Sequence, residues 1–163
     1  MVAMMRARSL GLAALLLGVI AAPARADLTG FIGATTTPEN RAAKGFAIGT
    51  GLLIFGFEFE FSSTSDDPAS GAPSLTTGMG NVMIQTPAAI YGFQPYFTGG
   101  GGIYRETLLS EQTTSVGANT GGGVKISLIG PLRLRVDYRL FKLGGGALYP
   151  TTHRVYAGLN LKF

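Results

Sequence analysis

Apolar and polar residues alternate in two internal segments of the chain and again at its C-terminal end. In residues 55–62, four phenylalanines alternate with Glu58, Glu60 and small residues. In residues 132–140, leucine, valine and tyrosine alternate with three arginines and an aspartate, and residues 154–163 continue the pattern to a final phenylalanine. Side chains on a strand repeat every two residues, whereas a helix would scatter both sets. The pattern therefore predicts three β-strands, each with one apolar face.

Weaker alternation between these segments indicates five further strands. We expect them at residues 28–37, 44–51, 78–86, 94–108 and 117–128. The connections are expected to alternate in length, with short turns at 52–53, 87–93 and 130–131 and longer polar loops at 38–43, 63–77, 109–116 and 144–151. Eight strands of about ten residues, joined in this way, are typical of a transmembrane β-barrel. The faces of the strand at 94–108 cannot be assigned, because Arg105 stands next to Glu106.

The first 26 residues have the features of a secretory signal peptide. Arg6 and Arg8 precede an apolar run over residues 10–22, and Ala24-Arg25-Ala26 fits an A-x-A cleavage site. The apolar run is shorter than the ~20 residues that a membrane-spanning helix needs. We expect its removal to leave one domain, residues 27–163, with Asp27 at its N-terminus.

This segment also accounts for most of the net charge. The chain has 13 Lys and Arg against 9 Asp and Glu, a net charge of +4. Three of those arginines lie in the first 26 residues, so the remaining chain has ten bases against nine acids. This near balance gives no support to nucleic-acid binding. The chain has no cysteine, which excludes disulfides and thiolate metal sites.

Alternation alone allows two barrels that are inside out relative to each other. A soluble lipocalin-type barrel has its apolar residues inside, and a membrane barrel has them outside. The signal peptide, the alternating loop lengths and the final Phe163 favour the membrane barrel. Each arginine facing lipid near the midplane would then cost ~2–4 kcal/mol. Arg133, Arg135 and Arg139 are therefore expected to face the lumen.

Buried charges need partners, and the sequence offers them on the polar faces of the predicted strands. The lumen of an eight-stranded barrel is only wide enough for side chains to fill. We therefore predict a hydrogen-bonded charge network, completed by Asn81 and Gln85, with no continuous channel. The predicted lumen charge network comprises Glu58, Glu60, Arg105, Lys125, Arg133, Arg135, Asp137, Arg139 and Lys162.

Taken together, these segments resemble a known family, the small eight-stranded outer-membrane β-barrel proteins such as the OmpA transmembrane domain and OmpX. The resemblance covers residues 27–163 and rests on residues 55–62, residues 94–100 and residues 133–140 leading to Phe163. It implies an all-β, eight-stranded antiparallel up-and-down transmembrane β-barrel. It also implies a location in the outer membrane, in contact with outer-membrane lipid and lipopolysaccharide.

In this family, the terminal aromatic residue and its alternating predecessors are the signal that the barrel-assembly machinery reads. The resemblance implies the same role for Leu159, Leu161 and Phe163. The chain has no tryptophan, so tyrosine and phenylalanine must form the aromatic girdles at the membrane surfaces. We expect the inner and outer girdles to comprise Tyr91, Phe93 and Tyr96, and Tyr104 and Tyr149, respectively.

His153, the only histidine, is a candidate for catalysis, because outer-membrane lipid A deacylases use a histidine and a serine near the outer end of a barrel. A general base must lie within hydrogen-bond reach of its nucleophile. No serine follows His153, which favours a histidine at the rim. One histidine and scattered carboxylates form no metal-ligand pattern, and the glycine clusters lack the features of a phosphate loop. We therefore expect no catalytic, metal or cofactor site.

The sequence thus favours a non-enzymatic outer-membrane barrel with a role in envelope integrity or surface interaction. Two alternatives share the fold: an enzyme that modifies lipid A or lipopolysaccharide, and an adhesin that acts through its outer loops. A soluble periplasmic ligand binder would require the opposite orientation of the strand faces. A small-solute channel would require a gap in the lumen network.

Overall fold

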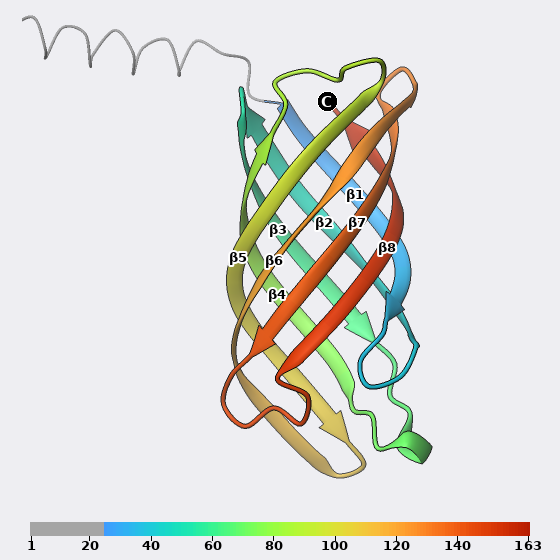
Figure 1. Cartoon of the computed structure of the whole chain (residues 1–163), viewed down its shortest axis with the longest axis vertical. Coiled ribbons are helices and arrows are strands. Elements are labelled where there is room, and N and C mark those ends of the chain that lie inside the picture. The colour runs from blue at the N-terminus through green and yellow to red at the C-terminus, as the bar shows by residue number, and fades with distance from the viewer. Residues whose placement is uncertain (1–24) are drawn as a thin grey trace, which may run out of the picture.

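The computed structural model describes residues 25–163, without the side chain of Arg25, and contains eight antiparallel strands and one short 3₁₀ helix in that range. Each strand pairs with its sequence neighbours and β1 pairs with β8, so the sheet closes into a barrel (Figure 1). The predicted fold class is confirmed. The elements are β1 (Arg25–Thr35), β2 (Arg41–Leu52), β3 (Phe55–Thr64), η1 (Pro68–Ser70), β4 (Ser74–Gln85), β5 (Phe93–Leu108), β6 (Glu111–Ile129), β7 (Leu132–Leu143) and β8 (Thr151–Lys162).

The predicted signal peptide, residues 1–26, lies outside the described residues except for its last two positions. Those two positions begin β1, where the backbone of Ala26 exchanges two hydrogen bonds of 2.9 Å with Phe163. Within the part of the chain that the structure describes, no helix is both long and apolar enough to cross a bilayer. The cleavage site remains a prediction.

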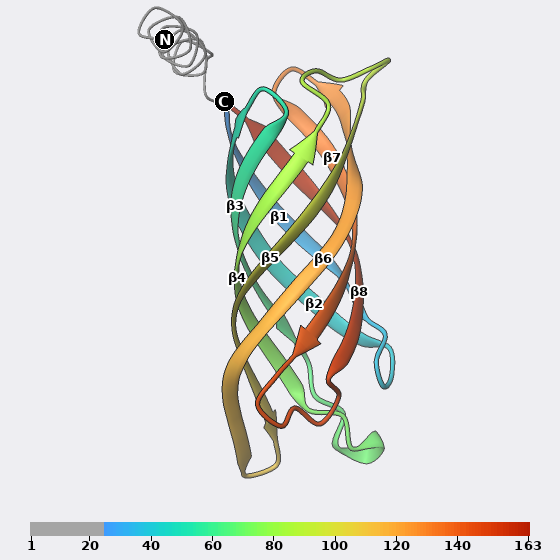
Figure 2. The ribbon, with the colours of Figure 1, turned by 60° about the vertical axis from the view of Figure 1, so that its left-hand side comes forward.

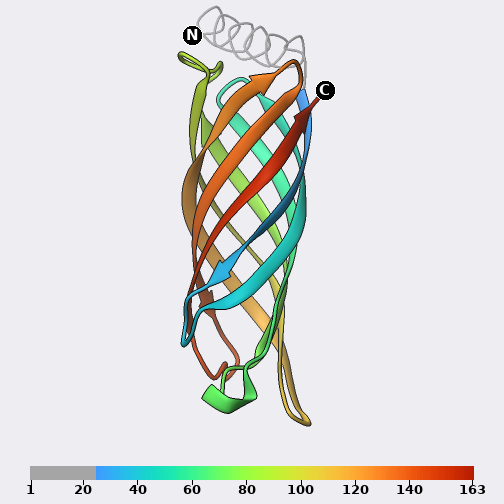
Figure 3. The same cartoon turned by 90° about the vertical axis from the view of Figure 1, so that its right-hand side faces the viewer.

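The two ends of the barrel differ in their connections. The turns at 53–54, 86–92 and 130–131 lie at the same end as the start of β1 and the C-terminus, which we call the inner end (Figures 1 and 3). The other four connections lie at the opposite, outer end. They comprise residues 36–40, 65–73, 109–110 and 144–150.

The predicted long loop at 109–116 is wrong. Residues 111–116 instead continue β6 and pair with residues 103–108 of β5, around a two-residue turn. The resulting hairpin extends beyond the neighbouring strands at the outer end (Figure 2). The segment is polar but contains two threonines and a valine, whose branched side chains favour an extended backbone. Polarity alone was therefore a poor sign of a loop here.

The two faces of the barrel wall have opposite character. Large apolar side chains face outward and remain exposed, including Phe57 at 59% and Ile32 at 74%. Charged side chains face inward, and Arg135, Arg139 and Glu60 are 0% exposed. So extensive an exposed apolar surface marks a surface that contacts lipid. The barrel is therefore inside out relative to a soluble one, as the placement of the arginines predicted.

Glycines of the barrel wall allow close approaches, and a Cβ at Gly123 would lie 2.6 Å from the hydroxyl oxygen of Tyr96, which faces the lumen. The glycine clusters at residues 99–102 and 121–123 lie on the paired strands β5 and β6. A Cβ at Gly121 would overlap the backbone oxygen of Tyr138 on β7. At this position β6 and β7 therefore lie too close together for any residue larger than glycine.

Candidate functional site in the lumen and at the outer rim

Four buried charges form a cluster at the centre of the lumen. Arg135 donates to both carboxylate oxygens of Glu58, and its Nη2 lies 3.0 Å from Oδ2 of Asp137. Arg139 donates to Glu58 Oε1 at 3.0 Å and, through Nε, to Asp137 Oδ1 at 2.8 Å. We call these four residues the central cluster. They meet because β3 and β7 each direct alternate residues inward from opposite sides of the barrel.

A second group continues the network towards the outer end. Arg154 on β8 pairs with Glu60 and donates to Ser62, and its guanidinium lies 4.7 Å from the ring centroid of Phe141. Glu60 also lies 3.5 Å from Arg139, which joins this group to the central cluster. Arg154 was missed by the sequence analysis, although it alternates in phase with the inward face of the last strand.

A third group lies towards the inner end. Asp27 accepts from Lys125 at 2.6 Å and from Arg133 at 3.3 Å. Arg133 also donates to Gln94 and Asn160, each at 2.8 Å. Asp27 was absent from the predicted network, because it was considered only as the first residue after cleavage. The structure thus brings together Lys125 and Arg133, as predicted, but around an acid that was not predicted.

Uncharged polar side chains complete the contacts. The Tyr96 hydroxyl donates to Asp137 and accepts from Nε of Arg135 at 2.7 Å. Asn119 accepts from Arg139 at 3.2 Å and donates to Asn81 at 2.8 Å, which gives Asn81 the hydrogen-bonding role predicted for it. Gln85 is half-buried at the end of β4. Each arginine of the central cluster therefore has neutral as well as charged partners.

The predicted girdles were wrong at two positions. Tyr96 and Tyr104 face the lumen and are buried, so neither can lie at the membrane surface. Tyr104 instead donates to the backbone oxygen of Gly144. Tyr91 and Phe93 are exposed near the inner end, and Tyr149 lies half-buried in the outer loop before β8.

Arg105 does not belong to the lumen network. Its side chain faces outward, where Nε donates to Thr114 Oγ1 at 3.2 Å. Glu106 faces inward instead and accepts from the backbone nitrogen of Leu148 at 3.0 Å. The four glycines of β5 interrupt the alternation, so the sequence could not fix the phase of this strand. Lys162 alternates in phase with the inward face of β8 and is half-buried at the inner end.

The outer part of the lumen is closed by apolar packing and by loops. A buried apolar cluster fills it and consists of Leu75, Met79, Tyr104, Phe141, Leu143 and Ala147. Arg41 donates to the backbone oxygens of Thr37, at 2.7 Å, Ser65, at 3.2 Å, and Pro73. This one side chain therefore connects the β1–β2 loop to the β3–β4 loop.

The burial of the network shows that the lumen is filled. A passage wide enough for water would expose the side chains that line it. Arg135, Arg139 and Glu60 are 0% exposed, and so are Thr29 and Asn160 nearer the inner end. Within the described residues, no water-sized gap reaches these side chains.

His153 lies outside the lumen. It faces outward near the outer end of β8, half-buried, with Nδ1 2.6 Å from the hydroxyl of Tyr138. The side-chain partner of His153 is thus the hydroxyl of Tyr138, and among residues 25–163 neither a serine nor a carboxylate forms a hydrogen bond with it. Among residues 25–163, no three metal-ligating side chains gather into a group.

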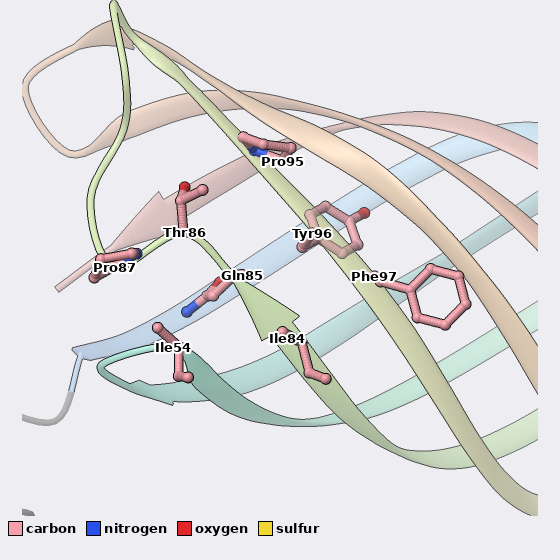
Figure 4. Close-up of a pocket in the computed structure, with 8 residues that line it drawn as sticks. All are labelled: Ile54, Ile84, Gln85, Thr86, Pro87, Pro95, Tyr96 and Phe97. Carbon is pink, nitrogen blue, oxygen red and sulfur yellow. The ribbon is translucent and has the colours of Figure 1, made fainter.

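A shallow groove of about 470 Å³ lies at the inner end, near the β2–β3 and β4–β5 turns (Figure 4). Its lining is mostly apolar, with Ile54, Ile84 and Phe97 among the side chains that the figure labels. The polar side chains that line the groove are those of Gln85, Thr86 and Tyr96, and none of them is a carboxylate or a base. The groove therefore has no pair of groups suited to acid–base or nucleophilic catalysis.

The sequence matches no family model and no curated protein. The structure, however, is similar to solved outer-membrane barrels. The N-terminal β-barrel domain of Pseudomonas aeruginosa OprF matches with a TM-score of 0.66 at 14% identity, over 85% of this chain and 97% of that domain. Neisserial surface protein A matches with a TM-score of 0.64 at 15% identity, over 86% and 96%. The outer-membrane enzyme PagL matches with a TM-score of 0.51 at 13% identity, over 84% and 98%.

These similarities confirm the resemblance in fold to small eight-stranded outer-membrane barrels. At such low identity they establish the fold alone. Since one of the three matches is an enzyme and another a surface protein, the fold does not determine the activity.

Proposed function

We propose that this protein is a small, non-enzymatic barrel of the outer membrane that acts through its wall and outer loops, in envelope integrity or surface interaction. The observation that carries the proposal is the closed lumen. Arg135, Arg139 and Glu58 are buried and paired with one another, so they serve as internal supports. What remains available for interaction is the outward-facing surface.

Three independent features support the location. The outward face of the wall is apolar, the structural matches include outer-membrane barrels, and the first 26 residues resemble an export signal. The inner end, where two of the three connections are two-residue turns, would then face the periplasm. The outer loops and the β5–β6 hairpin would face the exterior.

Assembly into the membrane would depend on the last strand. Leu159, Leu161 and Phe163 face outward and are exposed, so an assembly factor can reach them on the barrel surface. We propose that the barrel-assembly machinery reads this terminal pattern. Replacing Phe163 with a polar residue should lower the yield of folded barrel in cells without preventing refolding of the purified protein in detergent.

An enzymatic role is not favoured by the surroundings of His153. A hydrolytic mechanism would require a nucleophile beside this base, and its side-chain partner is the hydroxyl of Tyr138. The proposal predicts that cells with and without the protein contain identical lipid A by mass spectrometry. A change in acylation that depends on His153 would overturn the non-enzymatic assignment.

The proposal is tested by locating the protein and then recording its conductance. We expect it to fractionate with outer membranes and to migrate differently on gels before and after heating, as a stable barrel does. In planar bilayers, the purified protein should produce no large, stable open level, because the central cluster fills the lumen. A soluble periplasmic protein, or a stable conducting pore, would contradict the proposal.

A further inference from the structure

One row of outward-facing positions near the outer end is polar on five successive strands. Cross-strand pairs connect Lys44 of β2 to Ser63, Ser63 to Thr76, Thr76 to Arg105, and Arg105 to Thr114 of β6. These five residues, which we call the polar row, all lie on the face of the wall opposite the lumen.

The next outward row towards the inner end is entirely apolar. Phe46 pairs with Phe61, Phe61 with Gly78, Gly78 with Ile103, and Ile103 with Val116. Each of these residues lies two positions from a member of the polar row on the same strand, a distance of about 7 Å. The outward surface of these five strands therefore changes from apolar to polar between the two rows, as a barrel surface does where hydrocarbon gives way to headgroups.

Charge on the outward face of the wall has one sign. Every strand carboxylate except Glu111, at the tip of the β5–β6 hairpin, is buried in the lumen. The bases Lys44, Arg105 and Lys142 face outward, all near the outer end. Among the described residues, none of these three forms an ion pair. The remaining acids of the outer end are in the loops above the wall, at Glu39, Asp66 and Asp67.

We propose that the polar row binds the headgroup of an anionic glycolipid of the outer leaflet that carries two phosphates. Lys44 and Arg105 are separated by three strand spacings, about 14 Å, so each can bind a different phosphate. Arginine offers a phosphate two parallel hydrogen bonds, and lysine offers a compact charge. The hydroxyls of Ser63 and Thr76 lie between them and can bond to sugar or phosphate oxygens.

A groove beside Lys44 gives the same lipid a place for its acyl chains. It measures about 930 Å³ and lies on the outward face of the wall, over β1, β2 and β8. Its lining includes the apolar residues Ile32, Ala34, Ala42 and Ala157, and at the β2–β3 side it includes Lys44, Ser63 and Ser65. Figure 3 shows these three strands side by side. A groove that has a cation on one side and an apolar lining on the other matches the charged headgroup and the acyl chains of an anionic lipid.

This inference rests on the proposed function, because it requires the outer end to lie in the leaflet that contains such lipids. Its test uses the folded protein in lipid nanodiscs and measures lipid retention by native mass spectrometry. The probes are bisphosphorylated lipid A, monophosphorylated lipid A and phosphatidylcholine, with inorganic phosphate as a competitor. The variants are K44Q/R105Q and, as a matched control, K142Q, which removes an outward base outside the row.

We expect the wild-type protein to retain the bisphosphorylated lipid in preference to the other two. Each lost contact between a cation and a phosphate should weaken retention about fivefold. The double variant should lose the preference, and K142Q should keep it. Inorganic phosphate should not compete, because it has no acyl chains to occupy the groove.

Equal retention of the three lipids by the wild type, an unchanged preference in K44Q/R105Q, or competition by inorganic phosphate would overturn the inference. Heat-modifiable migration of each variant confirms that it is folded. Cell fractionation distinguishes a failure of the proposed function from a failure of the lipid-binding inference. If the protein is found outside the outer membrane, the proposed function fails. If it is a folded outer-membrane barrel that does not discriminate phosphates, this inference alone fails.

Discussion

The arginines of the lumen and the bases of the outer wall differ in one respect, the presence of a carboxylate partner. Arg135 and Arg139 are fully buried and share Glu58 and Asp137. Lys44 and Arg105 lie on the outward face without an acid. A buried charge must be neutralised within the protein, whereas a charge at the membrane surface can be neutralised by lipid. The lumen bases therefore support the fold, and the wall bases are available for interaction.

The largest expected effect comes from removing one charge of the central cluster. E58Q leaves Arg135 and Arg139 with one acid fewer in a site that water does not reach. The free energy of unfolding should fall by about 3–5 kcal/mol. Urea titration in detergent micelles, followed by the heat-modifiable gel shift, measures it. The control E111Q, at the exposed hairpin tip, should behave as wild type, and equal midpoints for all three proteins would rule out a structural role for the pairing.

A charge placed on the wall tests the depth of the apolar surface. F59R puts an arginine on the outward face of β3, which we expect to lower the free energy of unfolding by about 2–4 kcal/mol. T76R puts the same side chain in the polar row, where the expected loss is no more than about 1 kcal/mol. Unfolding in lipid vesicles compares the two. Equal losses would mean that the polar row does not mark the edge of the hydrocarbon.

A smaller change in stability is expected when glycines of the wall are replaced by alanine, and it should depend on how closely neighbouring atoms surround each glycine. G121A would bring a methyl group against the backbone oxygen of Tyr138, and overpacking of this kind typically costs about 1–3 kcal/mol. At Gly30, a Cβ meets no atom within 4 Å, so G30A should leave the stability almost unchanged. Thermal unfolding of the two variants in the same detergent provides the comparison. A stable G121A would show that β6 and β7 can separate at this point.

The smallest effect on stability is expected in the polar row. Lys44 and Arg105 make no buried contact, so K44Q/R105Q should unfold within about 0.5 kcal/mol of the wild type. Urea titration measures this alongside the lipid retention described above. A large loss of stability would mean that these bases contribute to the fold itself.

Strand alternation made the barrel and most of the lumen predictable from the sequence. The arginines of β7 and the glutamates of β3 lie on segments that alternate regularly. Their location in the lumen could therefore be predicted from the free-energy cost of exposing charge to lipid. In β5, four consecutive glycines have no side chain to mark a phase, so the faces of this strand could not be assigned and Arg105 was wrongly included in the lumen network. Which acid each arginine would meet depends on the register and shear of the barrel, which a single strand pattern does not contain.

The missed residues have equally local causes. Arg154 was in phase with the polar face of its strand, so a stricter application of alternation would have found it. Tyr96 and Tyr104 were interpreted by residue type, as membrane-surface aromatics, although their positions in β5 place them inside. Asp27 is paired with Lys125, which is 98 positions away along the chain and becomes its neighbour only when the barrel closes.

The most direct test of the account asks whether water reaches the lumen. The chain has no cysteine, so single replacements can be labelled without background. Thr29 is fully buried beside the central cluster, and Ser110 lies exposed at the tip of the β5–β6 hairpin. With a water-soluble maleimide, the folded S110C variant should react promptly, and T29C should react only after denaturation. Labelling of folded T29C at the rate of S110C would show an open, water-filled lumen and contradict the account.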